Sequence, residues 1–177
     1  MSNVEQITGA LARKFPVRIK TIDSHTAGES TRLIVGGLDP IPGGTITEKL
    51  AYFQRNFDHV RLALTREPRG HRDILAALLT EAVSPRSRFG LIYMDARRYP
   101  FLCGHATIGA VATLIEAGVI AITDPAERIT VDTPSGPMET RITMTNDRLA
   151  AVAVRTVPSF VYRTDELLDV PGHGRLK

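Results

Sequence analysis

The segment after Cys103, GHATIGAVATLIEAG, constrains the fold more than any other part of the chain. At the 3.6-residue period of a helix, Ile108, Val111 and Ile115 share one face. The opposite face carries small side chains, those of Ala106, Gly109, Ala110 and Ala112. Small residues let neighbouring elements approach closely, and a helix that is apolar on nearly all sides is a buried helix. We therefore expect a central helix enclosed by the strands.

Strand-like runs occur on both sides of this helix in the sequence. They are short, mostly apolar or alternating, and many are bounded by turns rich in glycine, proline and polar residues. They cover residues 17–24, 31–35, 74–79, 89–94, 129–132, 138–144 and 149–157. The last three predict a β-meander, and a second helix is expected from Thr45 to about Phe57. The polar stretch 121–128 contains a proline and is the candidate domain boundary.

Charge and cysteine content exclude several classes of protein. Lysine and arginine number 22 and aspartate and glutamate 19, so the net charge is +3, an excess too small to predict nucleic-acid binding. No apolar run approaches the roughly 18 residues of a membrane span, and the N-terminus lacks the apolar core of a signal peptide. A single cysteine excludes an internal disulfide and favours a reducing compartment. We expect a cytoplasmic protein without membrane contact.

Cys103 stands where the central helix begins, and a thiol can become reactive at such a position. Only the thiolate acts as base or nucleophile, and a helix N-terminus lowers the pKa of a thiol from its usual value of about 8.5. The backbone N–H groups of Gly104, His105 and Ala106 would form a receptor for a carboxylate or phosphate. A base beside a carboxylate receptor suits removal of a proton next to a carboxylate.

Two other interpretations fit the same residue types. Free cysteines are often buried and inert, and Cys103 fits that description equally well. A cysteine–histidine hydrolase would take its histidine from a distant part of the chain. His25 or His71 could supply it, with Asp23 or Asp73 orienting the ring. A single Cys-x-His pair offers too few ligands for zinc, so no metal site is predicted.

Six segments carry a resemblance to a known family. They are IDSHTAGESTR (22–32), EPRGH (67–71), LCGHATIG (102–109), VDTPSGPMETR (131–141), TVPSF (156–160) and VPGHG (170–174). In order and spacing these resemble IDSHTGGEPTR, EPRGH, MCGHGTIG, ETPAGLV, NVPSF and VPG-x-G of the proline racemase family. That family includes proline racemases, 4-hydroxyproline 2-epimerases and trans-3-hydroxy-L-proline dehydratases.

The resemblance implies a fold and a mechanism. The implied fold is α+β, of the diaminopimelate-epimerase type, in which each of two lobes is a curved, mostly antiparallel sheet around a central helix. The first lobe would occupy residues 1–125, and an incomplete second lobe would begin at residues 126–177. The implied mechanism uses no cofactor. One cysteine on each side of the substrate's α-carbon acts, and Cys103 corresponds to the first.

The resemblance also implies residues that contact a small-molecule substrate, proline or hydroxyproline. His105 corresponds to the histidine beside the ring nitrogen of the substrate. The amides around Gly104 and His105 correspond to part of the carboxylate receptor, to which Ala106 adds a third amide. His71 is a further candidate for substrate contact, although a structural role in its turn is the alternative.

The chain departs from the family pattern in ways that leave the reaction open. The second catalytic motif, SPCGTGT, is absent from the 177 residues, and its cysteine or threonine separates racemisation and epimerisation from dehydration. The chain is therefore a fragment, one half of a split enzyme, or an incomplete protein that binds only a small carboxylate or a partner chain. An unfinished meander exposes a sheet edge, so we expect a homodimer or pairing with a missing C-terminal half. Ile74 or Leu75 falls near where the proline racemases carry a phenylalanine, which indicates a different or more polar substrate, and ARRYPFL before Cys103 in place of the usual NxGYLxM marks a divergent branch.

Overall fold

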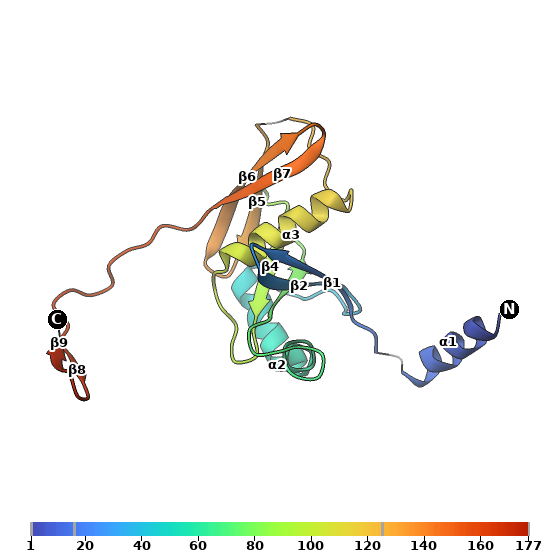
Figure 1. Cartoon of the computed structure of the whole chain (residues 1–177), viewed down its shortest axis with the longest axis horizontal. Coiled ribbons are helices and arrows are strands. Elements are labelled where there is room, and N and C mark those ends of the chain that lie inside the picture. The colour runs from blue at the N-terminus through green and yellow to red at the C-terminus, as the bar shows by residue number, and fades with distance from the viewer. Residues whose placement is uncertain (1, 16, 125, 177) are drawn as a thin grey trace.

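A seven-stranded sheet that curls around helix α3 forms the body of the protein (Figure 1). The computed structural model describes residues 2–15, 17–124 and 126–176. The helices are α1 (Asn3–Lys14), α2 (Ile46–Thr65) and α3 (Gly104–Glu116). The strands are β1 (Lys20–Thr26), β2 (Glu29–Gly36), β3 (Leu75–Thr80), β4 (Phe89–Met94), β5 (Arg128–Thr133), β6 (Gly136–Thr145), β7 (Arg148–Arg155), β8 (Leu168–Val170) and β9 (Gly174–Leu176).

The strands of the large sheet lie side by side in the order of the sequence, from β1 to β7. Strands β1–β2, β3–β4, β5–β6 and β6–β7 pair antiparallel, whereas β2–β3 and β4–β5 pair parallel. A parallel pair needs a crossover connection, which α2 supplies between β2 and β3 and α3 between β4 and β5. Helix α3 contacts both edge strands, β1 and β7, so the sheet wraps around it. The predicted α+β lobe, a curved and mostly antiparallel sheet around a central helix, is confirmed.

Strand β4 is apolar along its whole length because helices cover both faces of the sheet there. Leu91 and Tyr93 belong to the hydrophobic cluster on the α3 side, and Ile92 and Met94 belong to the cluster on the α2 side. All four side chains are fully buried. The middle of the sheet is therefore a rigid platform, and α3 lies directly on it.

Helix α2 begins where predicted but continues further. The Thr45 side chain accepts a hydrogen bond from the backbone N–H of Glu48, as an N-cap residue does. Phe57 has non-helical backbone angles, φ −129° and ψ 15°, and the helix resumes after this kink and ends at Thr65. The predicted end near Phe57 is wrong because Val60, which follows the kink, is buried and anchors the second part of the helix.

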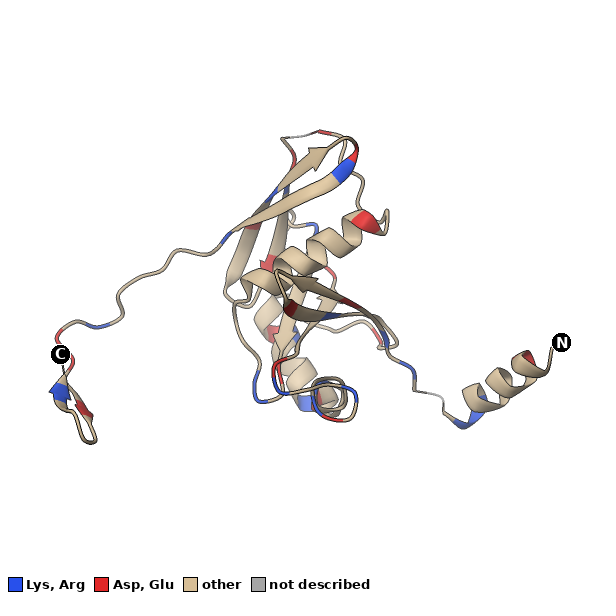
Figure 2. Ribbon diagram, viewed as in Figure 1, with Lys and Arg blue, Asp and Glu red and all other residues tan. Residues whose placement is uncertain are grey.

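Helix α3 is the buried helix that the small residues predict. Figure 2 shows no charged residue along it before Glu116, close to its C-terminal end. A Cβ atom at Gly109 would lie 3.2 Å from Ser24 Oγ and 3.3 Å from Thr31 Oγ1. Strands β1 and β2 therefore pack so closely on α3 that a larger side chain would push them away.

The predicted division between residues 125 and 126 does not separate two sheets. Strand β5 pairs with β4 through Phe89–Val131 and Gly90–Asp132, so the described residues of 128–155 continue the sheet of the first lobe. The polar stretch taken as a boundary is instead the connection from α3 to β5. After β7 the chain runs extended to the separate β8–β9 hairpin (Figure 1).

Candidate active site

Cys103 is the N-cap residue of α3, and hydrogen bonds fix its backbone. Its φ of −150° and ψ of 107° are extended, and the helix starts at the next residue. The carbonyl oxygen of Cys103 accepts hydrogen bonds from the Thr107 hydroxyl at 2.7 Å and from the Thr107 backbone N–H at 3.2 Å. The Tyr93 hydroxyl on β4 lies 2.6 Å from Thr107 Oγ1. A chain of hydrogen bonds from the sheet to the helix thus holds the cysteine in place.

The thiol of Cys103 is buried, with 8% of the residue exposed, and lies beside His105. Its sulfur is 3.4 Å from His105 Nδ1 and 3.9 Å from His105 Nε2. Burial raises the pKa of the thiol, the backbone N–H groups of Ala106 and His105 lower it, and the carboxylate of Glu29 raises it again. The net direction is upward, so the prediction of a lowered pKa is wrong. Desolvation outweighs the helix N-terminus here, and no regular N-cap hydrogen bond to the sulfur forms.

A hollow of about 650 Å³ opens beside this first turn of α3. It is lined by Glu29, Arg72, Asp73, Ile74, Leu75, Asp95, Arg97, Arg98 and His105. His105 connects the hollow to the thiol, since this residue lines the hollow and its ring lies 3.4 Å from the sulfur. The Thr26 hydroxyl at the end of β1 donates to the His105 carbonyl at 3.0 Å and fixes the turn from the other side. The site therefore combines a buried thiol, a helix N-terminus and an open polar space.

Comparison with known proteins decides which family this architecture represents. The family model for proline racemase matches residues 21–177, most of the chain. The chain belongs to the proline racemase family. The proline racemase of Clostridioides difficile is 39% identical over 164 residues, which cover 93% of this chain and 49% of that protein.

Other members of the proline racemase family resemble the chain to a similar degree. The 4-hydroxyproline 2-epimerase of Streptosporangium roseum is 37% identical and covers 88% of this chain and 46% of that protein. The trans-3-hydroxy-L-proline dehydratase of Burkholderia ambifaria is 36% identical, with 88% and 47% covered. A solved structure of a probable proline racemase from Agrobacterium radiobacter K84, with bound carbonate, superposes with a TM-score of 0.81 at 29% identity. It covers 90% of this chain and 47% of that one. The chain thus spans about half the length of the relatives it matches.

In this member of the proline racemase family, four of the five predicted site residues lie together. Cys103, Gly104, His105 and Ala106 form the N-cap and the first turn of α3. His71 is not with them: it lies in the exposed turn before β3, where its Nδ1 accepts from the Asp73 backbone N–H at 3.3 Å. The lining of the hollow includes its neighbours Arg72 and Asp73 but not His71. The described geometry therefore supports a structural role for His71 rather than substrate contact.

The hydrolase interpretation finds no support among the described residues. The Asp23 carboxylate forms a two-pronged ion pair with the Arg32 guanidinium, at 2.9 and 2.7 Å, instead of orienting a histidine. His25 Nδ1 accepts from the Gly28 backbone N–H at 3.3 Å and so stays within its own hairpin turn. No group of three or more His, Cys, Asp or Glu side chains in the described ranges could hold a metal ion. No helix of the described chain is long and apolar enough to cross a membrane.

Sequence reasoning missed four residues that shape the site. Glu29 follows a two-residue hairpin turn, and the sequence gives no sign that this hairpin returns to the start of α3. Tyr93 could have been found, because it alternates with Leu91 on the α3 side of β4. Thr107 follows Cys103 by four residues, the spacing at which a hydroxyl reaches a helical carbonyl. Thr26 had no local signal, since its partner is 79 residues away.

Proposed function

We propose that this chain supplies one side of the active site of a cofactor-independent racemase or epimerase acting on proline or hydroxyproline. Cys103 is the base that removes the α-proton. The single observation that carries the proposal is the placement of the thiol at the N-terminus of a buried helix, 3.4 Å from the His105 ring. Family membership and relatives described as proline racemase and 4-hydroxyproline 2-epimerase support the same reaction class.

The proton transfer follows from the groups around the thiol. The thiolate takes the α-proton, so an S–H bond forms, the C–H bond breaks and its electron pair moves into the substrate carboxylate. The amides of Gly104, His105 and Ala106 bind that carboxylate and stabilise the developing charge, as donors at an oxyanion site do. We infer that the His105 ring contacts the substrate nitrogen, the role that the family resemblance implies.

The raised pKa of the thiol sets a condition on this mechanism. Without substrate, burial favours the neutral thiol. A bound amino acid brings a positively charged nitrogen close to the sulfur, and an opposite charge at a few ångströms favours the thiolate. We infer that the base forms when the substrate binds, which protects the free enzyme from oxidation and alkylation.

Inversion of configuration needs a second acid on the opposite side of the α-carbon. Cys103 is the chain's single cysteine, so we infer that another lobe or another chain provides the second group. Pairing with a second lobe, or with a second copy of this chain, would also cover the exposed sheet edge at β7. A reducing compartment such as the cytoplasm would keep the thiol free.

A second candidate reaction is dehydration of trans-3-hydroxy-L-proline. The observation that favours it is the dehydratase of Burkholderia ambifaria, which is nearly as similar as the epimerase. Cys103 would again remove the α-proton, but the electron pair would expel the hydroxyl group on the neighbouring carbon. The product would be an unsaturated ring rather than a stereoisomer.

Proton NMR in D₂O tests the proposal on this chain. L-proline, trans-4-hydroxy-L-proline and trans-3-hydroxy-L-proline are each incubated with the chain, and the α-proton signal and the configuration are followed. One base is enough to exchange the α-proton with retention, so we expect loss of the signal of proline or 4-hydroxyproline and no inversion without a second lobe. Inversion would show that a second copy supplies the other acid, and a new unsaturated product would favour dehydration.

Variants assign any exchange to the site. Cys103→Ser should abolish exchange and His105→Gln should slow it strongly, whereas the matched control His173→Gln changes an exposed histidine of the β8–β9 hairpin and should have no effect. Binding of the planar analogue pyrrole-2-carboxylate is measured in parallel. Exchange at the wild-type rate in Cys103→Ser, or neither exchange nor analogue binding in the wild type, would refute the proposed function.

A further inference from the structure

We propose that the hollow beside His105 binds a second acidic group of the substrate, and that Arg97 and Arg98 recognise it. The proposal rests on the proposed function, because it names the substrate class of the same site. Proline and hydroxyproline would still enter the site, but a proline-like amino acid with an additional carboxylate on the ring would bind more tightly.

Three arginines line one space together with His105, the residue beside the reacting thiol. Arg72, Arg97 and Arg98 all line the hollow, as does His105, whose ring lies 3.4 Å from the Cys103 sulfur. Arginine presents its donors in a planar fork that matches a carboxylate. Proline and hydroxyproline carry no negative charge beyond the carboxylate bound at the helix, so they would leave these guanidinium groups unused.

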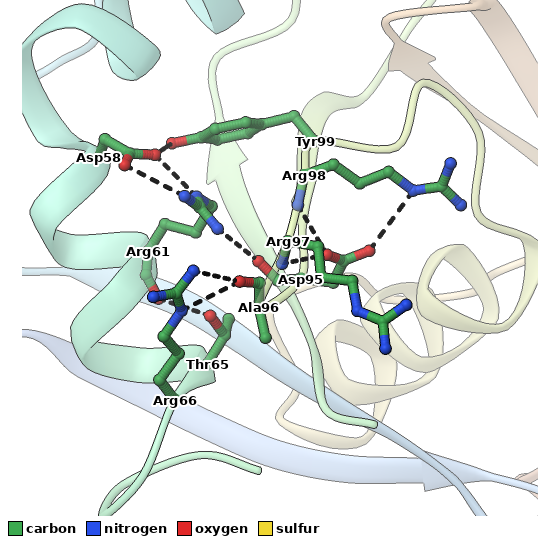
Figure 3. A network of polar contacts seen from close by, with 9 residues as sticks. All are labelled: Asp58, Arg61, Thr65, Arg66, Asp95, Ala96, Arg97, Arg98 and Tyr99. Carbon is green, nitrogen blue, oxygen red and sulfur yellow. Dashed lines mark hydrogen bonds and ion pairs between the residues drawn. The ribbon is translucent and has the colours of Figure 1, made fainter. Parts of the chain in front are cut away.

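The side chains of Arg97 and Arg98 have few interactions with the rest of the described chain. Among the described residues, the Arg97 side chain makes no hydrogen bond or ion pair. Arg98 has one long contact, its Nε lying 3.8 Å from Asp95 Oδ2, and its side chain is 80% exposed. In Figure 3 both side chains extend away from the loop. Both guanidinium groups are therefore available to a ligand.

Apart from the contact between Asp95 Oδ2 and Arg98 Nε at 3.8 Å, no acidic residue of the hollow pairs with Arg97 or Arg98 in the described part of the chain. Asp95 Oδ1 accepts the backbone N–H groups of Arg97 at 2.7 Å and of Arg98 at 2.8 Å, so this carboxylate is engaged by its own loop. Glu29 and Asp73 are the other two acids of the lining. They suit the positively charged nitrogen of an amino acid, and the arginines suit its additional carboxylate.

The loop that carries the arginines is held in place by α2. Arg61 Nη1 donates to the Asp95 carbonyl at 2.9 Å, and the Arg66 guanidinium donates twice to the Ala96 carbonyl, at 3.0 and 2.9 Å (Figure 3). Asp58 fixes Arg61 at 2.7 Å and accepts from the Tyr99 hydroxyl at 2.7 Å. The Arg61 guanidinium also stacks 5.1 Å above the Tyr99 ring.

These contacts anchor the loop on both sides of the two arginines. The anchored backbone pre-organises the guanidinium positions, and pre-organisation reduces the ordering cost of binding. The same loop leads directly to the N-cap cysteine, so the arginines and the thiol keep a fixed relation. In the sequence, this loop is ARRYPFL, the segment that departs from the usual pattern of the family.

Two planar pyrrole carboxylates can test the second acidic site separately from the proposed function. Pyrrole-2-carboxylate carries one carboxylate and tests binding at the first turn of α3. Pyrrole-2,4-dicarboxylate carries an additional carboxylate, which tests binding by the arginines. Dissociation constants of both are measured by calorimetry at one low ionic strength. A charge-assisted hydrogen bond makes binding about tenfold to a hundredfold tighter, so we expect that preference for the dicarboxylate in the wild-type chain.

The variant R97Q/R98Q should lose the preference and keep the affinity for pyrrole-2-carboxylate. The control R86Q/R88Q removes the same number of charges at exposed positions outside the hollow and should keep the preference. Equal affinity for the two probes in the wild type, or a preference that survives in R97Q/R98Q, would overturn the inference while leaving the function intact. Absence of binding for both probes would overturn the inference, and together with absence of α-proton exchange it would overturn the proposed function as well. Circular dichroism and urea midpoints confirm that each variant is folded.

Discussion

The hydrogen bonds from Tyr93 through Thr107 to Cys103 should be energetically coupled. Thr107 has a single hydroxyl proton, which it donates to the Cys103 carbonyl at 2.7 Å. The 2.6 Å contact with Tyr93 must then use the tyrosine proton. Both residues are buried, so removal of one partner can leave the other unsatisfied, and removal of both should cost less than the sum of the two single losses.

The magnitudes follow from which groups each variant leaves without a partner. Tyr93→Phe removes one donor and should lower the free energy of unfolding by about 1 kcal/mol. Thr107→Val loses the bond to the Cys103 carbonyl and also leaves the buried Tyr93 hydroxyl unsatisfied, for a loss of about 2–3 kcal/mol. In the double variant no phenol is left unsatisfied, so its loss should be smaller than the sum of the single losses by about 1 kcal/mol.

Urea denaturation followed by circular dichroism measures these losses, with the slope m checked for each variant. The control Tyr52→Phe removes a tyrosine hydroxyl that makes no hydrogen bond in the described chain, and its effect should stay within about 0.5 kcal/mol. Additive single losses, equal to the double loss within about 0.3 kcal/mol, would refute the coupling. The cysteine would then be held by the helix backbone alone.

Three further predictions concern the thiol and its surroundings. Burial and Glu29 raise the pKa of Cys103, so iodoacetamide should label the thiol slowly at neutral pH, and the labelling rate should still rise with pH above the usual thiol pKa of about 8.5. Glu29→Gln should shift this dependence of the labelling rate on pH to lower pH, and an unshifted dependence would contradict the placement of the Glu29 carboxylate. A Cβ at Gly104 would meet β7 at an ordinary 3.7 Å, so Gly104→Ala should change stability by less than about 0.5 kcal/mol yet weaken pyrrole-2-carboxylate binding; unchanged binding in a titration would argue against the carboxylate receptor. A Cβ at Gly90 would lie 2.6 Å from Ile46 Cδ1, so Gly90→Ala should lower the free energy of unfolding by about 1–3 kcal/mol, and an unchanged urea midpoint would contradict this tight packing.

The part of the fold that could be predicted from the sequence is the part set by local pattern. The helix after Cys103 is apolar on nearly all sides, and this pattern predicts its burial. The short, largely apolar run of β4 predicts a strand whose two faces are both covered. The first turn of α3 could also be predicted, because its residues are consecutive in the chain. The end of α2 was not, since burial of Val60 by tertiary packing overrides the irregular backbone at Phe57.

Features that depend on distant contacts escaped prediction. The pKa of Cys103 is raised mainly by burial, and no local sequence pattern reports the extent of that burial. The pairing of β5 with β4 could not be predicted from residues 121–128, because a polar connection looks the same whether it joins two domains or two strands of one sheet. The Arg61 and Arg66 contacts to the loop before Cys103 span 34 and 30 residues and have no signature in the sequence.

The junction between β4 and β5 sets how the site can open. Phe89–Val131 and Gly90–Asp132 are the only register pairs that join these strands in the described sheet, and the Asp132 carboxylate adds bonds from the Val83 and Ser84 amides at 2.7 and 2.8 Å. Hydrogen exchange should therefore find that β5, β6 and β7 open as one unit, at a lower free energy than the centre of the sheet. Because β7 packs on α3, each such opening would briefly expose the Cys103 thiol to solvent. The rate of Cys103 labelling at neutral pH would then report how often β5, β6 and β7 open.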